Sequence, residues 1–390
     1  MKTEENNGNI IIYPVGTIDQ NNSLEFQDEL IEKAKGHEEL IINMQDVKYI
    51  SSAGLRVLVK LNRDKIRFRI TDVSLEVYEI FRITGFVEMF DISRAMRTIS
   101  VDGCDVIGQG FYGTIYRLDE DTIVKVYESS DSIPMIENER KCANLAFIKG
   151  IPTAISYDIV KVGDSYGAVF EMLKAKTFND LLIEEPEKAD ELIEKYVDFI
   201  RLVHGTVLDT DSIPYAADKY KGYLDTIRVY LTDHQYDAMI ALIDKLPPDD
   251  HAVHGDFHMK NVMMVDGEPM LIDMDTLSRG NAIFDLVGLY VGYILFIEDV
   301  PGRNEKFLGI SDEMCHRIWN GVMELYFKDT PNDVKDEIFK KIRLLSAIRF
   351  LYIIEKSHYK YEPEAPIWIK HSQETIEELI ERVDSLIFEV

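Results

Sequence analysis

The chain has 390 residues, of which 46% are apolar, so it is long enough for two or three domains with sizeable cores. Its formal net charge of −27 argues against nucleic acid or an anionic membrane as a partner. A polar N-terminus, the lack of a long uncharged apolar run and three widely spaced cysteines predict a cytoplasmic protein without a secretory signal or membrane span.

The charge is distributed unevenly along the chain. Residues 1–100 carry 13 basic and 16 acidic side chains, which leaves 30 basic and 54 acidic side chains for residues 101–390. The second part is therefore expected to be a separate unit. Its acidity fits either the attraction of a cationic substrate or simple solubility.

Strand and helix patterns alternate in the first hundred residues. Apolar, β-branched runs predict strands, and apolar residues at helical spacing predict helices. The predicted strands are residues 9–15, 40–44 and 66–70, and the predicted helices are residues 24–34, 55–61 and 77–86. Ser23 is placed to cap the first helix. We therefore predict a small α/β domain over residues 1–100, in which helices pack on a sheet.

The pattern changes after residue 100 to a β-rich segment followed by a long helical one. The predicted elements are a hairpin from Val106, strands at residues 122–127 and 166–172, and a helix at residues 135–149. Beyond Asn179 most of the chain has helical periodicity. Residues 101–390 are thus expected to form an α+β domain, with a β-rich N-lobe over about 101–175 and a helical C-lobe over about 176–390.

The stretch from His254 to Asn261 reads His-Gly-Asp-Phe-His-Met-Lys-Asn and is followed by Asp273. Phosphoryl transfer needs one carboxylate to receive the proton of the attacking hydroxyl, and it needs oxygen ligands that hold Mg²⁺. We predict that Asp256 is the catalytic base or orients the attacking hydroxyl, and that Asn261 and Asp273 are the Mg²⁺ ligands. The alternative is a polar loop between two buried strands.

Four residues near this set are predicted to have a structural role or a role that the sequence leaves open. His254 is expected to brace the loop, whereas His258 either approaches phosphate or substrate or is structural. Asp275 is either a second metal ligand or a solvated neighbour. Asp285 is expected to hydrogen-bond the backbone of the catalytic loop.

A glycine run upstream has the form GxGxxGxI, with Gly108, Gly110 and Gly113. Such runs also occur in dinucleotide-binding folds and in ordinary hairpins. Here a strand rather than a helix follows the run, which favours a flap over the phosphates of ATP.

A lysine on the next predicted strand, Lys125, lies between apolar residues and is predicted to contact the α- and β-phosphates. Its ammonium group needs an anionic partner. Glu139 is preferred to Glu137, because its helical stripe also carries small apolar residues. The backbone of Glu171 and Leu173, at the end of a later strand, is predicted to hydrogen-bond the adenine ring.

Residues 101–390 resemble the aminoglycoside phosphotransferase and choline kinase branch of the protein-kinase-like fold. The residues that match this branch are Gly108, Gly110, Gly113, Lys125, Glu139, His254, Gly255, Asp256, Asn261, Asp273 and Asp285. His-Gly-Asp, in place of His-Arg-Asp, is typical of its small-molecule enzymes, although the complete glycine run is more like that of a protein kinase. The resemblance implies a bilobal fold and Mg²⁺-dependent transfer from ATP to a hydroxyl of a small molecule or a serine.

The chain departs from protein kinases in two respects. The motif from Asp273 to Asp275 lacks the glycine of protein kinases, and no activation segment follows it. Regulation by phosphorylation of such a loop is therefore not expected. The resemblance leaves the acceptor open, and aminoglycosides are one class of candidate.

The first hundred residues resemble the STAS domains of anti-sigma-factor antagonists, through the run from Asp46 to Leu58. In that family a partner kinase phosphorylates a serine, which aligns with Ser52, and thereby switches protein binding. The usual preceding Asp is Ser51 in this chain. A phosphate on Ser52 would meet the free N–H groups at a helix N-terminus. The alternative is that Ser51 and Ser52 only cap this helix.

Three functions therefore follow from the sequence. The first is an ATP- and Mg²⁺-dependent phosphotransferase regulated by a fused STAS domain, which binds a protein partner. The second is a signalling adaptor whose kinase-like part only senses nucleotide. The third combines them, with Ser52 phosphorylated by the attached phosphotransferase domain in cis or in trans.

Overall fold

A computed structural model describes residues 1–6, 8–109, 113–129 and 132–388. The chain divides into two compact units, which are described one at a time. The first comprises Met1–Ser100 with Ile159–Gly163, and the second comprises Val101–Asp158 with Asp164–Val390. In the described part of the chain, no helix is both long and apolar enough to cross a membrane.

The first unit is an α/β structure built on a five-stranded sheet with the order β1-β2-β4-β6-β7. β1 is antiparallel to β2, and the other neighbouring strands are parallel. A second pair, β3 and β5, is also parallel, as is β8 with β12. The strands are β1 (Lys2–Asn6), β2 (Asn9–Tyr13), β3 (Val15–Ile18), β4 (Leu40–Asn43), β5 (Asp46–Ile50), β6 (Phe68–Val73), β7 (Ile92–Arg94), β8 (Arg97–Ile99) and β12 (Asp158–Val162).

The helices of the first unit are α1 (Ser23–Ala34), α2 (Ser52–Arg63), α3 (Leu75–Ile83) and α4 (Phe86–Met89). They bury an apolar core with the sheet, as the alternating pattern predicts. Two local predictions are wrong. Ser23 is the first residue of α1 and not its cap, because the chain turns at Asn22. The helix predicted over 77–86 is two helices, because Gly85 adopts a left-handed conformation between them.

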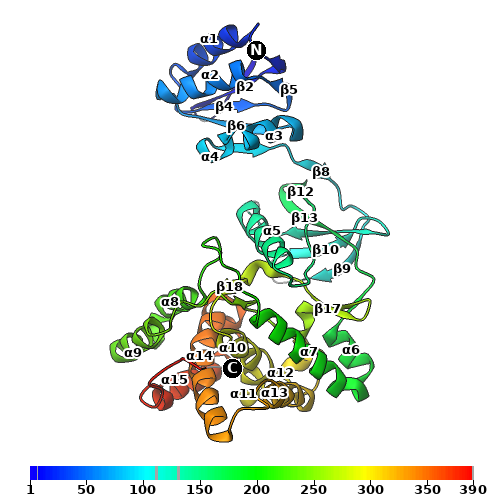
Figure 1. Cartoon of the computed structure of the whole chain (residues 1–390), viewed down its shortest axis with the longest axis vertical. Helices are drawn as coiled ribbons and strands as arrows, with labels where there is room; N and C mark the ends of the chain where they lie inside the picture. Colours follow the sequence, from blue (N-terminus) through cyan, green and yellow to red (C-terminus); the bar gives the residue numbers. More distant parts are fainter. Residues whose placement is uncertain (7, 110–112, 130–131, 389–390) are drawn as a thin grey trace. The chain divides into compact units, whose positions relative to one another are not determined.

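The second unit begins with a β-rich lobe, shown in cyan and green in Figure 1. Its strands β13, β11, β10 and β9 lie in that order in one sheet. Each of these strands is antiparallel to its neighbours in this order. Helix α5 packs on this sheet. The elements are β9 (Asp105–Gln109), β10 (Gly113–Arg117), β11 (Thr122–Tyr127), α5 (Ile133–Ile148) and β13 (Ser165–Glu171).

A helical lobe follows (Figure 1). Most of the buried apolar residues of the second unit belong to it. Its helices are α6 (Phe178–Glu184), α7 (Ala189–His204), α8 (Ala216–Thr226), α9 (Asp233–Asp244), α10 (Ile283–Tyr290), α11 (Phe296–Asp299), α12 (Arg303–Phe307), α13 (Asp312–Tyr326), α14 (Asn332–Lys356) and α15 (Ala365–Leu379). Short strands interrupt it at β14 (Lys176–Thr177), β15 (Ala252–Val253), β16 (Val262–Val265), β17 (Glu268–Leu271) and β18 (Ser278–Arg279). The loops between these short strands carry the His254–Asn261 stretch and Asp273.

Candidate active site

The ammonium of Lys125 lies between two carboxylates. Lys125, in the middle of β11, places Nζ 3.1 Å from Oε2 of Glu139 on α5 and 2.6 Å from Oδ1 of Asp273 after β17. Burial by itself lowers the pKa of Lys125, but the charges of Glu139 and Asp273 outweigh it and raise the pKa above its ordinary value. The ammonium therefore stays charged in a site that is largely closed to water, and the predicted pairing with Glu139 is present.

Tyr127 adds a hydrogen bond that the sequence reasoning missed. Its hydroxyl donates to Oε2 of Glu139, and the side chain is buried. Tyr127 is two residues from Lys125 on the same strand, so both side chains point to the same face of the sheet. That spacing was the signal in the sequence that could have identified it.

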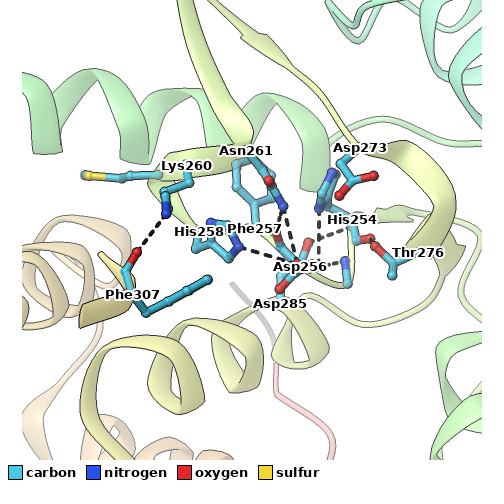
Figure 2. A network of polar contacts seen from close by, with 12 residues as sticks. His254, Asp256, Phe257, His258, Lys260, Asn261, Asp273, Thr276, Asp285 and Phe307 are labelled. Carbon is cyan, nitrogen blue, oxygen red and sulfur yellow. Dashed lines mark hydrogen bonds and ion pairs between the residues drawn. The ribbon is translucent and has the colours of Figure 1, made fainter. Parts of the chain in front are cut away.

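Asp256 is surrounded by polar side chains (Figure 2). Nδ2 of Asn261 donates to the backbone oxygen of Asp256 at 2.9 Å and to its Oδ2 at 3.3 Å, and Nε2 of His258 lies 3.5 Å from Oδ2. Arg349 approaches Oδ1 from the other side at 3.7 Å. Burial raises the pKa of Asp256, but His258 and Arg349 lower it below its ordinary value overall. The carboxylate is thus ionised at neutral pH and able to accept a proton.

A buried carboxylate holds the loop that carries Asp256. Asp285 on α10 accepts hydrogen bonds from the backbone N–H of His254 at 2.8 Å and of Gly255 at 2.5 Å (Figure 2). Its Oδ2, which accepts from His254, also lies 3.0 Å from Nε2 of His204. The prediction that Asp285 bonds the backbone of this loop is therefore confirmed. His254 in turn accepts from the N–H of Asp256 at 3.2 Å, which is the bracing role expected of it.

Asp273 has an unusual backbone conformation. Its φ is +62°, in the left-handed region that residues other than glycine rarely adopt. Such conformations cluster at functional sites. Asp275 lies two residues on, and its backbone oxygen accepts from Asn138 at 3.2 Å. Burial, together with the charges of Asp273 and Glu139, raises the pKa of Asp275 to about 7.

A cavity of about 480 Å³ lies beside Lys125 and Asp273. Its walls are mostly apolar, and its charged end holds Lys125, Glu139, Asn261 and Asp273. Gly108, Gly113, Glu171 and Leu173 also line it, as expected for the flap and for the segment before the helical lobe. At Gly113 a Cβ would lie 2.2 Å from the backbone oxygen of Val126, so no other residue fits between β10 and β11. Gly110, the third predicted glycine of the flap, lies outside the described residues.

The shape and chemistry of the cavity fit a nucleoside triphosphate with a divalent cation. The apolar walls suit a flat base, and Lys125 suits phosphate oxygens. Asn261 and Asp273 both bring oxygen donors to the cavity, and oxygen is the ligand that Mg²⁺ prefers. Because the NH₂ group of Asn261 is used by Asp256, its carbonyl oxygen is the atom left to face a cation. The residues present therefore fit Mg²⁺-bound ATP.

Ser52 lies in the first unit. It is the first residue of α2 and is exposed, while the hydroxyl of Ser51 caps the helix by accepting from the N–H of Ala53 at 3.2 Å. The hydroxyl of Ser51 therefore caps the helix, and the hydroxyl of Ser52 is not needed for this cap.

Arg349 was also missed by the sequence reasoning. It is on α14, far along the chain from Asp256, and no motif marks it. Only the packing of α14 in the helical lobe brings it to the site.

Comparison with protein families gives two matches. The model of the STAS domain matches residues 1–99. The model described as "Phosphotransferase enzyme family" matches residues 104–309, which is more than half of the chain. None of the curated proteins searched matches the chain.

Solved structures match the second unit's fold. One is a thermostable mutant of aminoglycoside phosphotransferase APH(4)-Ia in ternary complex with ADP and hygromycin B, with 11% identity and a TM-score of 0.51 over 72% of this chain and 94% of that one. Another is amicoumacin kinase hAmiN in complex with AMP-PNP, Ca²⁺ and Ami, with 15% identity and a TM-score of 0.50 over 73% of this chain and 90% of that one. At such low identity these likenesses show the fold alone.

Proposed function

We propose that this chain, which belongs to the phosphotransferase enzyme family, transfers phosphate from Mg²⁺-bound ATP to a hydroxyl group of a small molecule or a serine. The observation that carries the proposal is the convergence of Lys125, Asn261 and Asp273 at one end of a single cavity, next to Asp256. These groups come from β11, the loop after Asp256 and the segment after β17. They bring an ammonium group, an amide oxygen and a carboxylate together, and phosphoryl transfer needs groups of these kinds.

In the proposed reaction, the oxygen of the acceptor hydroxyl forms a bond to the γ-phosphorus of ATP. The bond from that phosphorus to the β,γ-bridging oxygen breaks, and ADP leaves. Asp256 receives the proton of the hydroxyl, and its low pKa suits a group that orients the acceptor and takes up the proton late. Lys125 binds phosphate oxygens and is itself oriented by Glu139.

Asn261 and Asp273 are the residues that would hold Mg²⁺, and this ion neutralises phosphate charge when bound. The glycine flap with Gly108, Gly110 and Gly113 would cover the phosphates. The backbone of Glu171 and Leu173 would bond the adenine ring, since both residues line the apolar end of the cavity. Positioning and charge neutralisation then supply most of the rate gain.

The test is Asp256→Ala with ATP turnover and nucleotide binding measured on the same preparation. We expect transfer to be abolished against a screen of hydroxyl compounds, while the affinity for AMP-PNP is largely kept. Normal ATP turnover by this variant would show that the assignment is wrong. A wild-type chain that binds nucleotide but transfers no phosphate to any acceptor would instead favour a nucleotide-sensing adaptor.

We also propose that the STAS domain regulates the enzyme and that Ser52 is a phosphorylation site. Ser52 is exposed at the first turn of α2, where free N–H groups and the helix dipole favour a phosphate. Mass spectrometry after incubation with Mg²⁺ and ATP tests whether the chain modifies itself. Phosphate on Ser52 in the wild type, but not in Asp256→Ala, is expected, and its absence from both would rule out self-phosphorylation.

A further inference from the structure

Arg349 is a charged side chain beside Asp256 that the proposed phosphoryl transfer does not use. Its side chain is only 13% exposed, and its guanidinium lies 3.7 Å from Oδ1 of Asp256. In the described part of the chain no other carboxylate forms an ion pair with it. A largely buried cation with a single distant partner has unused hydrogen-bonding capacity, because a guanidinium carries five N–H donors.

Tyrosines from two helices surround this guanidinium. Tyr220 and Tyr223 on α8 are close to Arg349, and Tyr352 is three residues further along α14 on the same face. The rings of Tyr223 and Tyr352 stack at a centroid distance of 4.0 Å. Gly288 on α10 lies against the guanidinium, since a Cβ there would be in van der Waals contact with its Nη1 at 3.4 Å. We call Tyr220, Tyr223, Arg349 and Tyr352 the arginine–tyrosine wall.

The hydroxyl of Tyr220 has no acceptor for its proton. Tyr220 is only 3% exposed, and the guanidinium of Arg349 is the donor that approaches its hydroxyl oxygen, while no described group accepts from it. Buried hydroxyl groups are normally hydrogen-bonded, because leaving a donor unpaired costs free energy. A hydroxyl with a free donor, beside a guanidinium with spare N–H groups, can offer two donors to an anion.

A second amine lies nearby. Lys219, also on α8, donates from Nζ to the backbone oxygen of Thr276 at 2.7 Å. Burial lowers the pKa of Lys219 below its ordinary value, so it adds less positive charge than an exposed lysine would. The negative groups near this region are Asp256, which is proposed to meet the acceptor hydroxyl, Asp275 and Asp285.

We propose that the acceptor carries an anionic group, a carboxylate or a phosphate, which binds Arg349 and the hydroxyl of Tyr220 while its own hydroxyl faces Asp256. This inference rests on the proposed function and specifies its substrate class. A planar guanidinium fork matches both anions. A cationic acceptor of the aminoglycoside type would instead meet the like charge of the Arg349 guanidinium, in spite of the overall acidity of the chain.

The test uses four small hydroxyl compounds that differ mainly in charge. Glycerate and glycerol 3-phosphate are anionic, glycerol is neutral, and 3-amino-1,2-propanediol is cationic. Each is titrated by saturation-transfer NMR against the full chain loaded with Mg²⁺ and AMP-PNP, so that the phosphate site is already filled. Comparing the affinities of glycerate and glycerol 3-phosphate shows whether the site prefers a carboxylate or a phosphate.

The wild type is expected to bind at least one anion more tightly than glycerol, and the cation most weakly. Arg349→Met should weaken binding of the anion roughly tenfold and abolish the preference, whereas Tyr220→Phe should weaken it about threefold. The matched control is Arg343→Met, which removes a cation from the same helix at its ion pair with Glu378. This control should leave the preference unchanged.

Three outcomes would overturn the inference: the cation binds best, neither anion binds better than glycerol, or Arg349→Met and Tyr220→Phe both keep the anion preference. If Arg349→Met does not fold, the preference for an anion over glycerol is measured in Tyr220→Phe and Arg349→Lys instead. Transfer of phosphate to a cationic acceptor would overturn this inference but keep the proposed function. Failure to bind AMP-PNP would overturn the proposed function, and titrations of the nucleotide-free chain would still measure the charge preference.

Discussion

Nζ of Lys125 lies 2.6 Å from Oδ1 of Asp273, although 148 positions separate the two residues in the sequence. The contact joins the β-rich lobe of the second unit to the loop that follows β17. It brings a cation proposed to bind phosphate against a carboxylate proposed to hold Mg²⁺. The charged end of the cavity therefore depends on the correct packing of both lobes.

Replacing Lys125 by Met should remove this link. The variant leaves Glu139 and Asp273 without their shared ammonium, and it removes a positive charge from the phosphate site. We expect kcat/KM for ATP to fall by about 10²-fold, as for the loss of one preorganised donor. Steady-state ATP turnover measures the effect, and Lys188→Met, which removes an exposed lysine, should leave it unchanged. Normal turnover in Lys125→Met would contradict the role given to this lysine.

Tyr127→Phe should affect nucleotide binding without harming the fold. Its hydroxyl holds Oε2 of Glu139, which in turn orients Lys125, and the ring itself would stay in place. We expect KM for ATP to rise about three- to tenfold with little change in the midpoint of thermal unfolding. Tyr157→Phe, at a half-exposed tyrosine, is the control. An effect on stability alone would show that Tyr127 is only a packing residue.

Asp285→Asn should reduce stability in a pH-dependent way. Burial raises the pKa of Asp285, but its bonds with His204 and the loop backbone lower it below the ordinary value overall. A carboxylate with a lowered folded-state pKa stabilises the protein above its unfolded pKa of about 4, and this stabilisation is lost as the pH falls through the folded-state pKa.

The variant should therefore be less stable than the wild type by about 2–3 kcal/mol at pH 7, and the difference should shrink below about pH 4. Denaturant unfolding at several pH values measures it. Asp198→Asn, at an exposed ion pair with Arg201, should change stability by less than about 0.5 kcal/mol. A difference that is constant down to pH 3 would refute this account.

The three cysteines should differ in reactivity. Burial raises the pKa of Cys142 and of Cys315 to about 11, so that little thiolate forms at pH 8. Cys104 is only partly buried. Ellman's reagent should therefore titrate one thiol per native chain and three in denaturant, and Cys104→Ser should remove the fast reaction. Rapid reaction of two or three thiols in the native chain would contradict the burial described.

Gly54→Ala should destabilise the first unit. A Cβ at this position would lie 2.7 Å from Cγ1 of Ile50 and 2.8 Å from Cγ2 of Ile18, so α2 could not keep its close packing. Overpacking of this kind costs about 1–3 kcal/mol. Ser52→Ala, at an exposed position of the same helix, is the matched control and should have a much smaller effect.

Unfolding of the two units can be followed with two probes. Circular dichroism reports on both units, whereas tryptophan fluorescence reports on the second, because it contains both Trp319 and Trp368. Circular dichroism should show earlier urea unfolding of Gly54→Ala, while the tryptophan fluorescence transition stays in place. Unchanged circular dichroism would refute the steric argument.

The sequence alone was sufficient for the parts of this protein that have local signals. Alternating strand and helix periods indicated the α/β structure of the first hundred residues. The spacing from Asp256 to Asn261, with Asp273 following, led to the proposal of phosphoryl transfer. Lys125 between apolar neighbours, and Glu139 on a stripe of small residues, were sufficient to predict their ion pair. These signals lie in short segments of the chain, where spacing and side-chain chemistry limit the alternatives.

The tertiary structure alone decided which distant residues meet. Arg349 and its tyrosine neighbours lie on α8 and α14, and no local pattern relates them to Asp256. The contact of Lys125 with Asp273 likewise joins separate elements. Such contacts form because helices and strands bury their apolar faces together, and the polar side chains that meet at the edges of that packing follow from the whole core rather than from any one segment.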